Sequence, residues 1–163
     1  MRVLVVSDTH RYGDNFYALV EQLEEIDLVI HCGDIEGQEY EFEEVVQECF
    51  QCPFVAVTGN NDFFSNLDQE AAINVGPLRA LVTHGHHYYV SMSNEFIKQE
   101  AKARGFDMVF YGHTHRPVFE QQDGITVVNP GSLTYPRQEG RRPSYALLEV
   151  EPNGKVSGSI CYI

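Results

Sequence analysis

Short apolar runs separated by helical patterns organise the first third of the chain. The runs at residues 3–6, 28–31 and 54–57 have the length and near-continuous apolar character of strands buried on both faces. Between them, apolar residues recur every three or four positions at about residues 15–25 and 38–50. This spacing predicts two helices, the first with Asp14 or Asn15 as its N-cap. The alternation predicts an α/β fold in which helices cover both sides of a sheet.

The period of the pattern changes after residue 57. Two strands around the turn Gly76-Pro77, a helix and a buried strand are expected next, at residues 71–75, 78–82, 94–104 and 108–111. Ser93 or Asn94 is the expected cap of this helix. Four more strands are expected, with turns at Asp123-Gly124 and Asn153-Gly154, over residues 118–120, 125–128, 145–150 and 156–163. We therefore expect a mostly antiparallel C-terminal third within a single domain, residues 1–163.

Charge and composition narrow the classes of partner. The 163 residues include 11 Lys and Arg against 24 Asp and Glu, a net charge of −13, which repels phosphate backbones and argues against extended nucleic-acid binding. No apolar run approaches the roughly 18 residues of a membrane helix, and no export signal is visible, so we expect a cytoplasmic protein without membrane contact. The four cysteines are expected to be reduced, and the pair Cys49 and Cys52 to pack as apolar side chains near a helix end.

Residue types that bind metals directly follow five of the expected strands. The five segments are Ser7-Asp8-Thr9-His10, His31-Cys32-Gly33-Asp34, Thr58-Gly59-Asn60-Asn61-Asp62, Thr83-His84-Gly85-His86 and Gly112-His113-Thr114-His115. Because ligands bind outside the carboxyl ends of strands in α/β sheets, these segments can converge on one edge. Carboxylate, amide and imidazole ligands without thiolate suit Mn, Fe(II), Zn or Mg. Asp34 is the natural carboxylate to bridge two metals about 3.5–4 Å apart.

These five motifs, followed by Asn129-Pro130-Gly131-Ser132, resemble the calcineurin-like metallophosphoesterase superfamily, and more narrowly its small single-domain prokaryotic phosphodiesterase branch. The resemblance implies two mixed β-sheets sandwiched together and flanked by helices, with antiparallel C-terminal strands. It implies two divalent ions per chain, with Mn²⁺ favoured over Zn²⁺, Fe²⁺, Ni²⁺ or Mg²⁺. The implied ligands are Asp8, His10, Asp34 and His115 for one ion, and Asp34, Asn60, His84 and His113 for the other.

The reaction implied by the resemblance is phosphodiester hydrolysis by a hydroxide that bridges the two metals. In many members that cleave phosphomonoesters, the Gly-Asn motif continues with a His, but here the position is Asn61. Because Asn cannot donate a proton to a leaving alkoxide, the sequence favours small phosphodiester substrates with good leaving groups. The candidate catalytic residues are Asn60, Asp62 and His86. The proton donor stays open among Asp62, His10 and His86.

Other residues have two interpretations each. His86 and His87 either face the substrate or face solvent, whereas His31 is expected to form structural hydrogen bonds.

The three arginines at positions 137, 141 and 142 either clamp a phosphate or form surface ion pairs.

The alternative function is a protein-interaction scaffold that resembles the metal-poor retromer subunit. Such a scaffold can lose its ligands, whereas every matching position here keeps a metal-binding residue type. A nuclease of the break-repair type would need capping domains and a basic track, for which this acidic chain has no room. Small members of the phosphodiesterase branch often self-associate, so the resemblance also allows a homo-oligomer.

Overall fold

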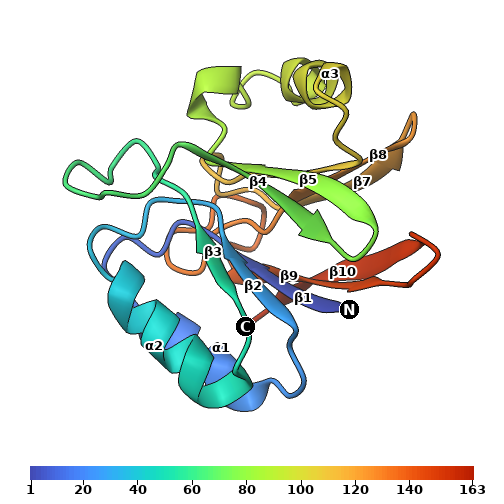
Figure 1. Cartoon of the computed structure of the whole chain (residues 1–163). Coiled ribbons are helices and arrows are strands. Elements are labelled where there is room, and N and C mark those ends of the chain that lie inside the picture. The colour runs from blue at the N-terminus through green and yellow to red at the C-terminus, as the bar shows by residue number, and fades with distance from the viewer.

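Two five-stranded sheets stack face to face in the computed structural model, which describes residues 1–163 (Figure 1). The strands are β1 (Arg2–Val6), β2 (Leu28–His31), β3 (Phe54–Ala56), β4 (Glu70–Val75), β5 (Leu78–Thr83), β6 (Met108–Phe110), β7 (Val118–Gln122), β8 (Ile125–Asn129), β9 (Ser144–Val150) and β10 (Val156–Tyr162). The helices are α1 (Asp14–Gln22), α2 (Glu39–Phe50), α3 (Glu95–Ala103) and the short 3₁₀ helix η1 (His86–Tyr88).

Both sheets are mixed, and the resemblance-based fold class is confirmed. The first sheet has the order β10-β9-β1-β2-β3, in which β1, β2 and β3 are parallel and the C-terminal hairpin β9–β10 is antiparallel. The second sheet has the order β4-β5-β6-β8-β7, in which β5, β6 and β8 are parallel and the two edge strands are antiparallel. Helices connect the parallel pairs β1–β2, β2–β3 and β5–β6, whereas the pair β6–β8 is connected through strand β7, because parallel strands cannot be joined by a tight turn.

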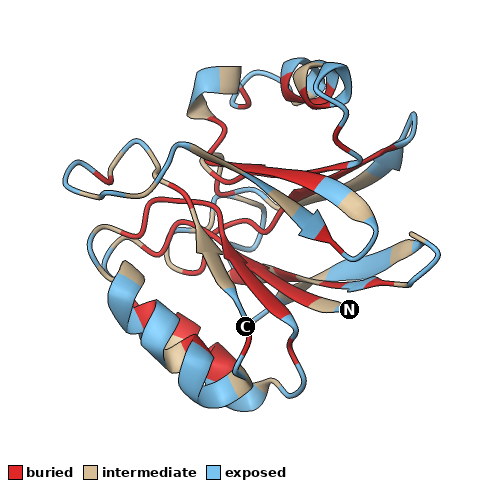
Figure 2. Cartoon of the chain, viewed as in Figure 1, coloured by how far each residue is buried: buried red, intermediate tan, exposed pale blue.

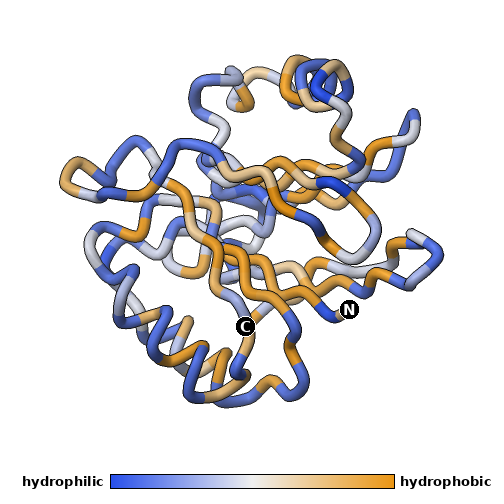
Figure 3. The backbone as a smooth tube through the Cα atoms, in the orientation of Figure 1, coloured by the Kyte–Doolittle hydropathy of each residue, from blue (hydrophilic) through white to orange (hydrophobic).

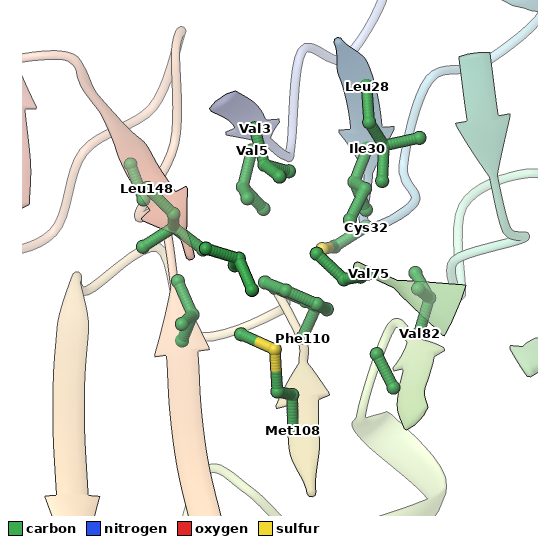
Figure 4. Close-up of a cluster of buried hydrophobic side chains, with 14 of the residues drawn as sticks. Val3, Val5, Leu28, Ile30, Cys32, Val75, Val82, Met108, Phe110 and Leu148 are labelled. Carbon is green, nitrogen blue, oxygen red and sulfur yellow. The ribbon is translucent and has the colours of Figure 1, made fainter. Parts of the chain in front are cut away.

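The expectation of one sheet with helices on both sides is wrong. Helices α1 and α2 cover the outer face of the first sheet, α3 covers the second, and the inner faces of the sheets pack on each other (Figure 1). The shared core includes Val3, Ile30, Phe110 and Leu148 (Figure 4). An apolar run buried on both faces predicts two covering layers, but it does not say whether a layer is a helix or a sheet.

The helices follow the predicted amphipathic pattern with shorter bounds. Buried positions lie on the inward faces of α1 and α2 (Figure 2), and apolar residues alternate with polar ones along both helices (Figure 3). In this outer core the rings of Phe16 and Phe42 stack at 4.1 Å between centroids. No helix is both long and apolar enough to span a membrane.

The predicted N-caps are only partly correct. Helix α1 begins after Gly13 without a side-chain cap, and the Asn15 amide instead donates to the carbonyl of Leu133 at 2.6 Å. For α3, the Ser93 hydroxyl accepts the backbone N–H of Glu95 at 3.0 Å. The two asparagines at helix starts instead make tertiary contacts, Asn15 with the Leu133 carbonyl and Asn94 with the Glu120 carboxylate at 3.1 Å.

Candidate metal centre

The loops that follow β1, β2, β3, β5 and β6 meet at one edge of the sandwich. The backbone N–H of His113 donates to Asp8 Oδ2 at 3.1 Å, which joins the loop after β6 to the loop after β1. Asn61 N–H donates to Asp34 Oδ1 at 2.8 Å, and this contact joins the loops after β3 and β2. The sheets thus bring together five segments that are distant in the sequence: Asp8 and His115, which are in contact, are 115 − 8 = 107 positions apart.

Two carboxylates and three imidazoles form the centre of this cluster. Asp8 Oδ1 lies 3.1 Å from His115 Nε2 and 3.9 Å from His10 Nε2. Asp34 Oδ2 lies 3.4 Å from His84 Nε2 and 3.7 Å from His10 Nε2. Within each of two groups, Asp8 with His10 and His115, and Asp8 with Asp34 and His84, all ligand atoms lie within 4.8 Å of one another. Asp34 faces histidines of both groups, as a bridging carboxylate would.

Each of the three imidazoles is oriented by a hydrogen bond at its other nitrogen. The acceptor is a Glu36 oxygen for His10, at 2.7 Å, the Cys32 carbonyl for His84, at 2.7 Å, and the Tyr135 carbonyl for His115, at 2.6 Å. In the neutral ring this places the proton on Nδ1 and directs the lone pair of Nε2 into the cluster. Partners of this kind typically fix metal-binding histidines.

The donor atoms fit a cation between them. His10 Nε2 and His115 Nε2 lie 3.4 Å apart, although both present lone pairs in that tautomer. Nitrogens at tetrahedral positions about 2.1 Å from one ion are separated by about 3.4 Å. Asp8 Oδ1 is buried without a hydrogen-bond partner, which is costly for an ionised oxygen. Electrostatic repulsion among these acceptors is relieved by a divalent cation, so the site fits the metals implied by the sequence.

The backbone at the cluster is unusual. Five of the seven candidate ligands have positive φ: Asp8 (55°), His10 (46°), Asp34 (57°), His113 (66°) and His115 (55°). This left-handed region is rare for residues other than glycine and costs of order 1–3 kcal/mol per residue. Hydrogen bonds between loops hold the conformation, including His10 N–H to the Asp34 carbonyl at 3.0 Å. Such strain gathers at functional sites, where the fold sets side-chain direction against local preference.

Two glycines allow the carboxylates to approach neighbouring backbone. A Cβ at Gly59 would overlap the Asp34 carboxylate, and a Cβ at Gly112 would lie 2.8 Å from Asp8 Oδ2 and overlap the Ser7 hydroxyl. Any larger residue at either position would therefore displace a candidate ligand.

Electrostatics keep both carboxylates ionised. Burial raises the pKa of Asp34, but hydrogen bonds from His84 and Asn61 outweigh it and hold this pKa well below its usual range. Burial acts on Asp8 in the same way, and His115 and His84 lower its pKa. Burial lowers the pKa of His84, but contacts with Asp34 and Asp8 overcome it and raise the pKa to about 9. The centre therefore favours positive charge between its two carboxylates.

Three other residues predicted from the sequence, Asn60, His113 and His86, lie around His84 and are less buried than it. Asn60 is exposed, with Oδ1 3.1 Å from His84 Nε2. The half-buried ring of His113 lies 5.2 Å from that of His84, between centroids. The ring of His86 lies 5.4 Å from His84 and 6.0 Å from His113, and its buried Nδ1 has no partner. Burial, together with His84, His87 and His113, lowers the pKa of His86 to about 4. His87 is exposed and packs on His86.

The Asp62 carboxylate links the loop after β3 to the loop after β2. Its Oδ2 accepts the backbone N–H groups of Gly59 at 2.6 Å and Asp34 at 2.8 Å, and its Oδ1 accepts that of Glu36 at 2.6 Å. Both oxygens are thus engaged by backbone donors. This geometry favours a positioning role for Asp62 over proton donation.

Both donors of Asn61 are also engaged, since its side-chain amide donates to Asp34 Oδ2 at 2.7 Å while its backbone N–H donates to Oδ1.

The structural role expected for His31 is confirmed. Its Nδ1 accepts the N–H of Gly33 at 3.2 Å, its Nε2 lies 3.2 Å from the Thr9 hydroxyl, and burial lowers its pKa to about 3.

Sequence reasoning missed the residues that support the centre from behind. Asn129 donates to the Gly112 carbonyl at 2.8 Å and to the Thr114 hydroxyl at 3.0 Å, and Ser132 donates to the Asp8 carbonyl at 2.8 Å. The motif Asn129-Pro130-Gly131-Ser132 was a signal for both. Glu36, the partner of His10, carries no signal beyond its place two residues after Asp34.

Comparison with known proteins agrees with this site. A profile of the calcineurin-like phosphoesterase superfamily domain matches residues 1–153. "Probable metallophosphoesterase YsnB" of Bacillus subtilis (strain 168) is 34% identical over 152 residues, which are 93% of this chain and 85% of that protein. "Phosphodiesterase MJ0936" of Methanocaldococcus jannaschii is 31% identical over 149 residues, 80% of this chain and 83% of that protein. The structure of wild-type Vps29 complexed with Zn²⁺, from Entamoeba histolytica, matches with a TM-score of 0.76 at 22% identity over 99% of each chain.

The chain belongs to the calcineurin-like phosphoesterase superfamily. Its similarity to small metallophosphoesterases of bacteria and archaea confirms the narrower resemblance seen in the sequence. Membership supports phosphoesterase activity and implies divalent metal ions, in agreement with the clustered ligand atoms. The likeness to Vps29 shows the fold alone.

Proposed function

We propose that this protein is a phosphodiesterase that uses two divalent metal ions. The observation that carries the proposal is the convergence of Asp8 and Asp34 with the Nε2 atoms of three histidines, two of which, those of His10 and His115, lie only 3.4 Å apart. The similarity to the phosphodiesterase of M. jannaschii supports the same class of reaction.

The ligand assignment is the one that the family resemblance implies, and each of the two groups of clustered ligand atoms supports part of it. Asp8, His10, Asp34 and His115 would hold the first ion, and Asp34, Asn60, His84 and His113 the second, with Mn²⁺ as the proposed metal. Divalent ions bound there supply a nucleophile from water near neutral pH and stabilise charge on the phosphoryl oxygens.

The remaining residues set position and specificity. We assign His86 to contact substrate, since its buried Nδ1 has no protein partner and its ring borders the second group. The Asp62 carboxylate holds the loops of Asp34 and Asn60 together because it accepts three backbone N–H groups. Asn61, whose amide is committed to Asp34, does not supply a proton to the leaving group. This arrangement favours diesters with acidic leaving groups over monoesters.

The test is hydrolysis of bis(p-nitrophenyl) phosphate by metal-stripped protein, with and without Mn²⁺, beside metal analysis and the monoester p-nitrophenyl phosphate. We expect about two ions per chain, metal-dependent hydrolysis, and faster cleavage of the diester. Asp34→Asn should lower kcat/KM by more than about 100-fold, since a bridging ligand serves both ions. Asp68→Asn, which alters an exposed carboxylate, is the matched control.

Three results would contradict the proposal in different ways. Faster cleavage of the monoester would overturn the diester preference, and two bound ions without hydrolysis would overturn the reaction. A protein that binds no metal and hydrolyses neither ester would instead match the scaffold alternative.

A further inference from the structure

A cavity lies beside the candidate metal centre, on the side of the first group of ligands. Its volume is about 580 Å³, and its lining includes His10 and His115 together with Arg116, Arg137 and Arg141. Pockets of this size commonly hold small organic ligands. The cavity therefore joins candidate ligands of the first ion to three guanidinium groups.

The three arginines have no carboxylate partner. Other basic side chains in the protein do, as in the ion pairs of Arg11 with Glu36 and Arg104 with Glu70. Of the 11 basic residues, four form such ion pairs: Arg11, Lys98, Arg104 and Lys155. Arg116, Arg137 and Arg141 form no ion pair, so the surface ion pairs considered from the sequence are absent at this cavity. Gathered guanidinium groups repel one another, and a bound anion relieves this repulsion.

The arginines that line the cavity differ from the three that the sequence groups together. Arg142 lies outside the lining of the cavity, with its guanidinium carbon 5.1 Å from the centre of the Tyr162 ring. Arg116, which the sequence reasoning did not include, takes its place because it follows His115 directly. Of the three arginines whose role the sequence left open between a phosphate clamp and surface ion pairs, Arg137 and Arg141 border the cavity and Arg142 does not.

Two hydrogen bonds attach the arginine segment to the centre. Arg137 N–H donates to the His115 carbonyl at 3.0 Å, and His115 Nδ1 donates to the Tyr135 carbonyl at 2.6 Å. A substrate whose scissile phosphate lies at the centre can therefore extend directly into the cavity.

We propose that this cavity binds a second phosphate of the substrate. The proposal rests on the function proposed above and names its substrate class: a phosphodiester that also carries a phosphomonoester group, as a nucleotide with two phosphates does when one of them is esterified to a second alcohol. Guanidinium groups suit this role because their planar forks bind phosphate oxygens in pairs.

Two matched substrates test the proposal. Thymidine 5′-(p-nitrophenyl phosphate) and its 3′-phosphorylated derivative share the scissile bond and the leaving group, and differ only in the added phosphate. For the Mn²⁺-loaded protein, we expect the 3′-phosphate to raise kcat/KM about tenfold or more, the gain of one charge-assisted contact. In the Arg137→Gln/Arg141→Gln variant the ratio of the two kcat/KM values should fall towards 1. Arg142→Gln should keep the wild-type ratio.

The outcomes separate this inference from the proposed function. Equal kcat/KM values in the wild type would overturn the phosphate site while the phosphodiesterase proposal stands. A high ratio that persists in the double variant would also overturn it. If no diester is hydrolysed, the proposed function fails, and calorimetry decides the cavity: thymidine 3′,5′-bisphosphate should bind about tenfold more tightly than thymidine 5′-monophosphate. Equal affinities, or the same preference in the double variant, would overturn the phosphate site.

Discussion

A single methyl group at position 59 would disturb the candidate bridging ligand. In Gly59→Ala, the new Cβ would lie 2.5 Å from the backbone nitrogen of Asp34 and 2.7 Å from its Cγ, whereas Cβ contacts under 3.0 Å essentially never occur. Asp34 would have to retreat by at least 3.0 − 2.5 = 0.5 Å. Metal–ligand distances tolerate only about ±0.2 Å. The substitution should therefore break coordination at Asp34 while it removes no ligand.

The expected magnitudes follow from this displacement. Disturbing the support of a metal ligand typically weakens metal affinity about 10- to 100-fold, and we expect this loss for Mn²⁺ in Gly59→Ala. Crowding of this kind typically lowers the free energy of unfolding by about 1–3 kcal/mol. Isothermal titration with Mn²⁺ measures the first effect, and urea unfolding of the metal-free protein measures the second.

A control separates metal binding from stability. Gly124→Ala, in the β7–β8 turn, adds a Cβ that meets no atom within 4 Å but strains a backbone with φ of +76°. It should lower stability and leave Mn²⁺ affinity unchanged. Wild-type Mn²⁺ affinity and stoichiometry in Gly59→Ala would refute the reasoning, because the carboxylate would then tolerate the displacement.

Two further predictions concern stability. His31 has a pKa of about 3 in the fold, against 6.5 ordinarily, so the unfolded chain binds its proton first, and this residue's share of stability is lost as the pH falls from about 6.5 towards 3. We expect the free energy of unfolding, measured with urea between pH 6 and 4.5, to depend less steeply on pH in His31→Asn than in the wild type, by up to about 1.4 kcal/mol per pH unit. An equal pH dependence in the two proteins would contradict the assignment. Asn129→Ala leaves the Gly112 carbonyl without its side-chain donor, which should cost about 1–3 kcal/mol of stability and also weaken Mn²⁺ binding. Thermal unfolding and Mn²⁺ titration check both effects, and a change in stability without a change in affinity would separate Asn129 from the centre.

Much of the site could be predicted from the sequence because its signals are local. Each metal-binding segment directly follows an apolar run, and the carboxyl ends of strands are where α/β sheets bind ligands. The convergence of Asp8, Asp34, His84 and His115 follows from this rule together with the motif order. The pairing of Asp34 with both groups agrees with the interpretation of Asp34 as a bridge.

Other roles depend on neighbours that are distant in the sequence. Nothing local in Asp62 shows that each of its oxygens accepts a backbone N–H from a distant segment, that of Asp34 and that of Glu36. Likewise, Arg137 and Arg142 have similar sequence surroundings, yet one borders the cavity and the other packs on Tyr162.

The sequence by itself determined the buried strands, the amphipathic helices and the set of metal-binding residue types. Both signals are local, because the hydrophobic period and the residue types that follow each strand can be recognised within a short stretch of sequence. Its periodicity did not distinguish a helix layer from a second sheet, since either buries the same apolar face. Only the tertiary structure decided which atoms face one another: the Nε2 atoms of His10 and His115 at 3.4 Å, and three arginines without carboxylate partners beside them. Such juxtapositions depend on sheet register and on the closure of distant loops, which no short stretch of sequence specifies.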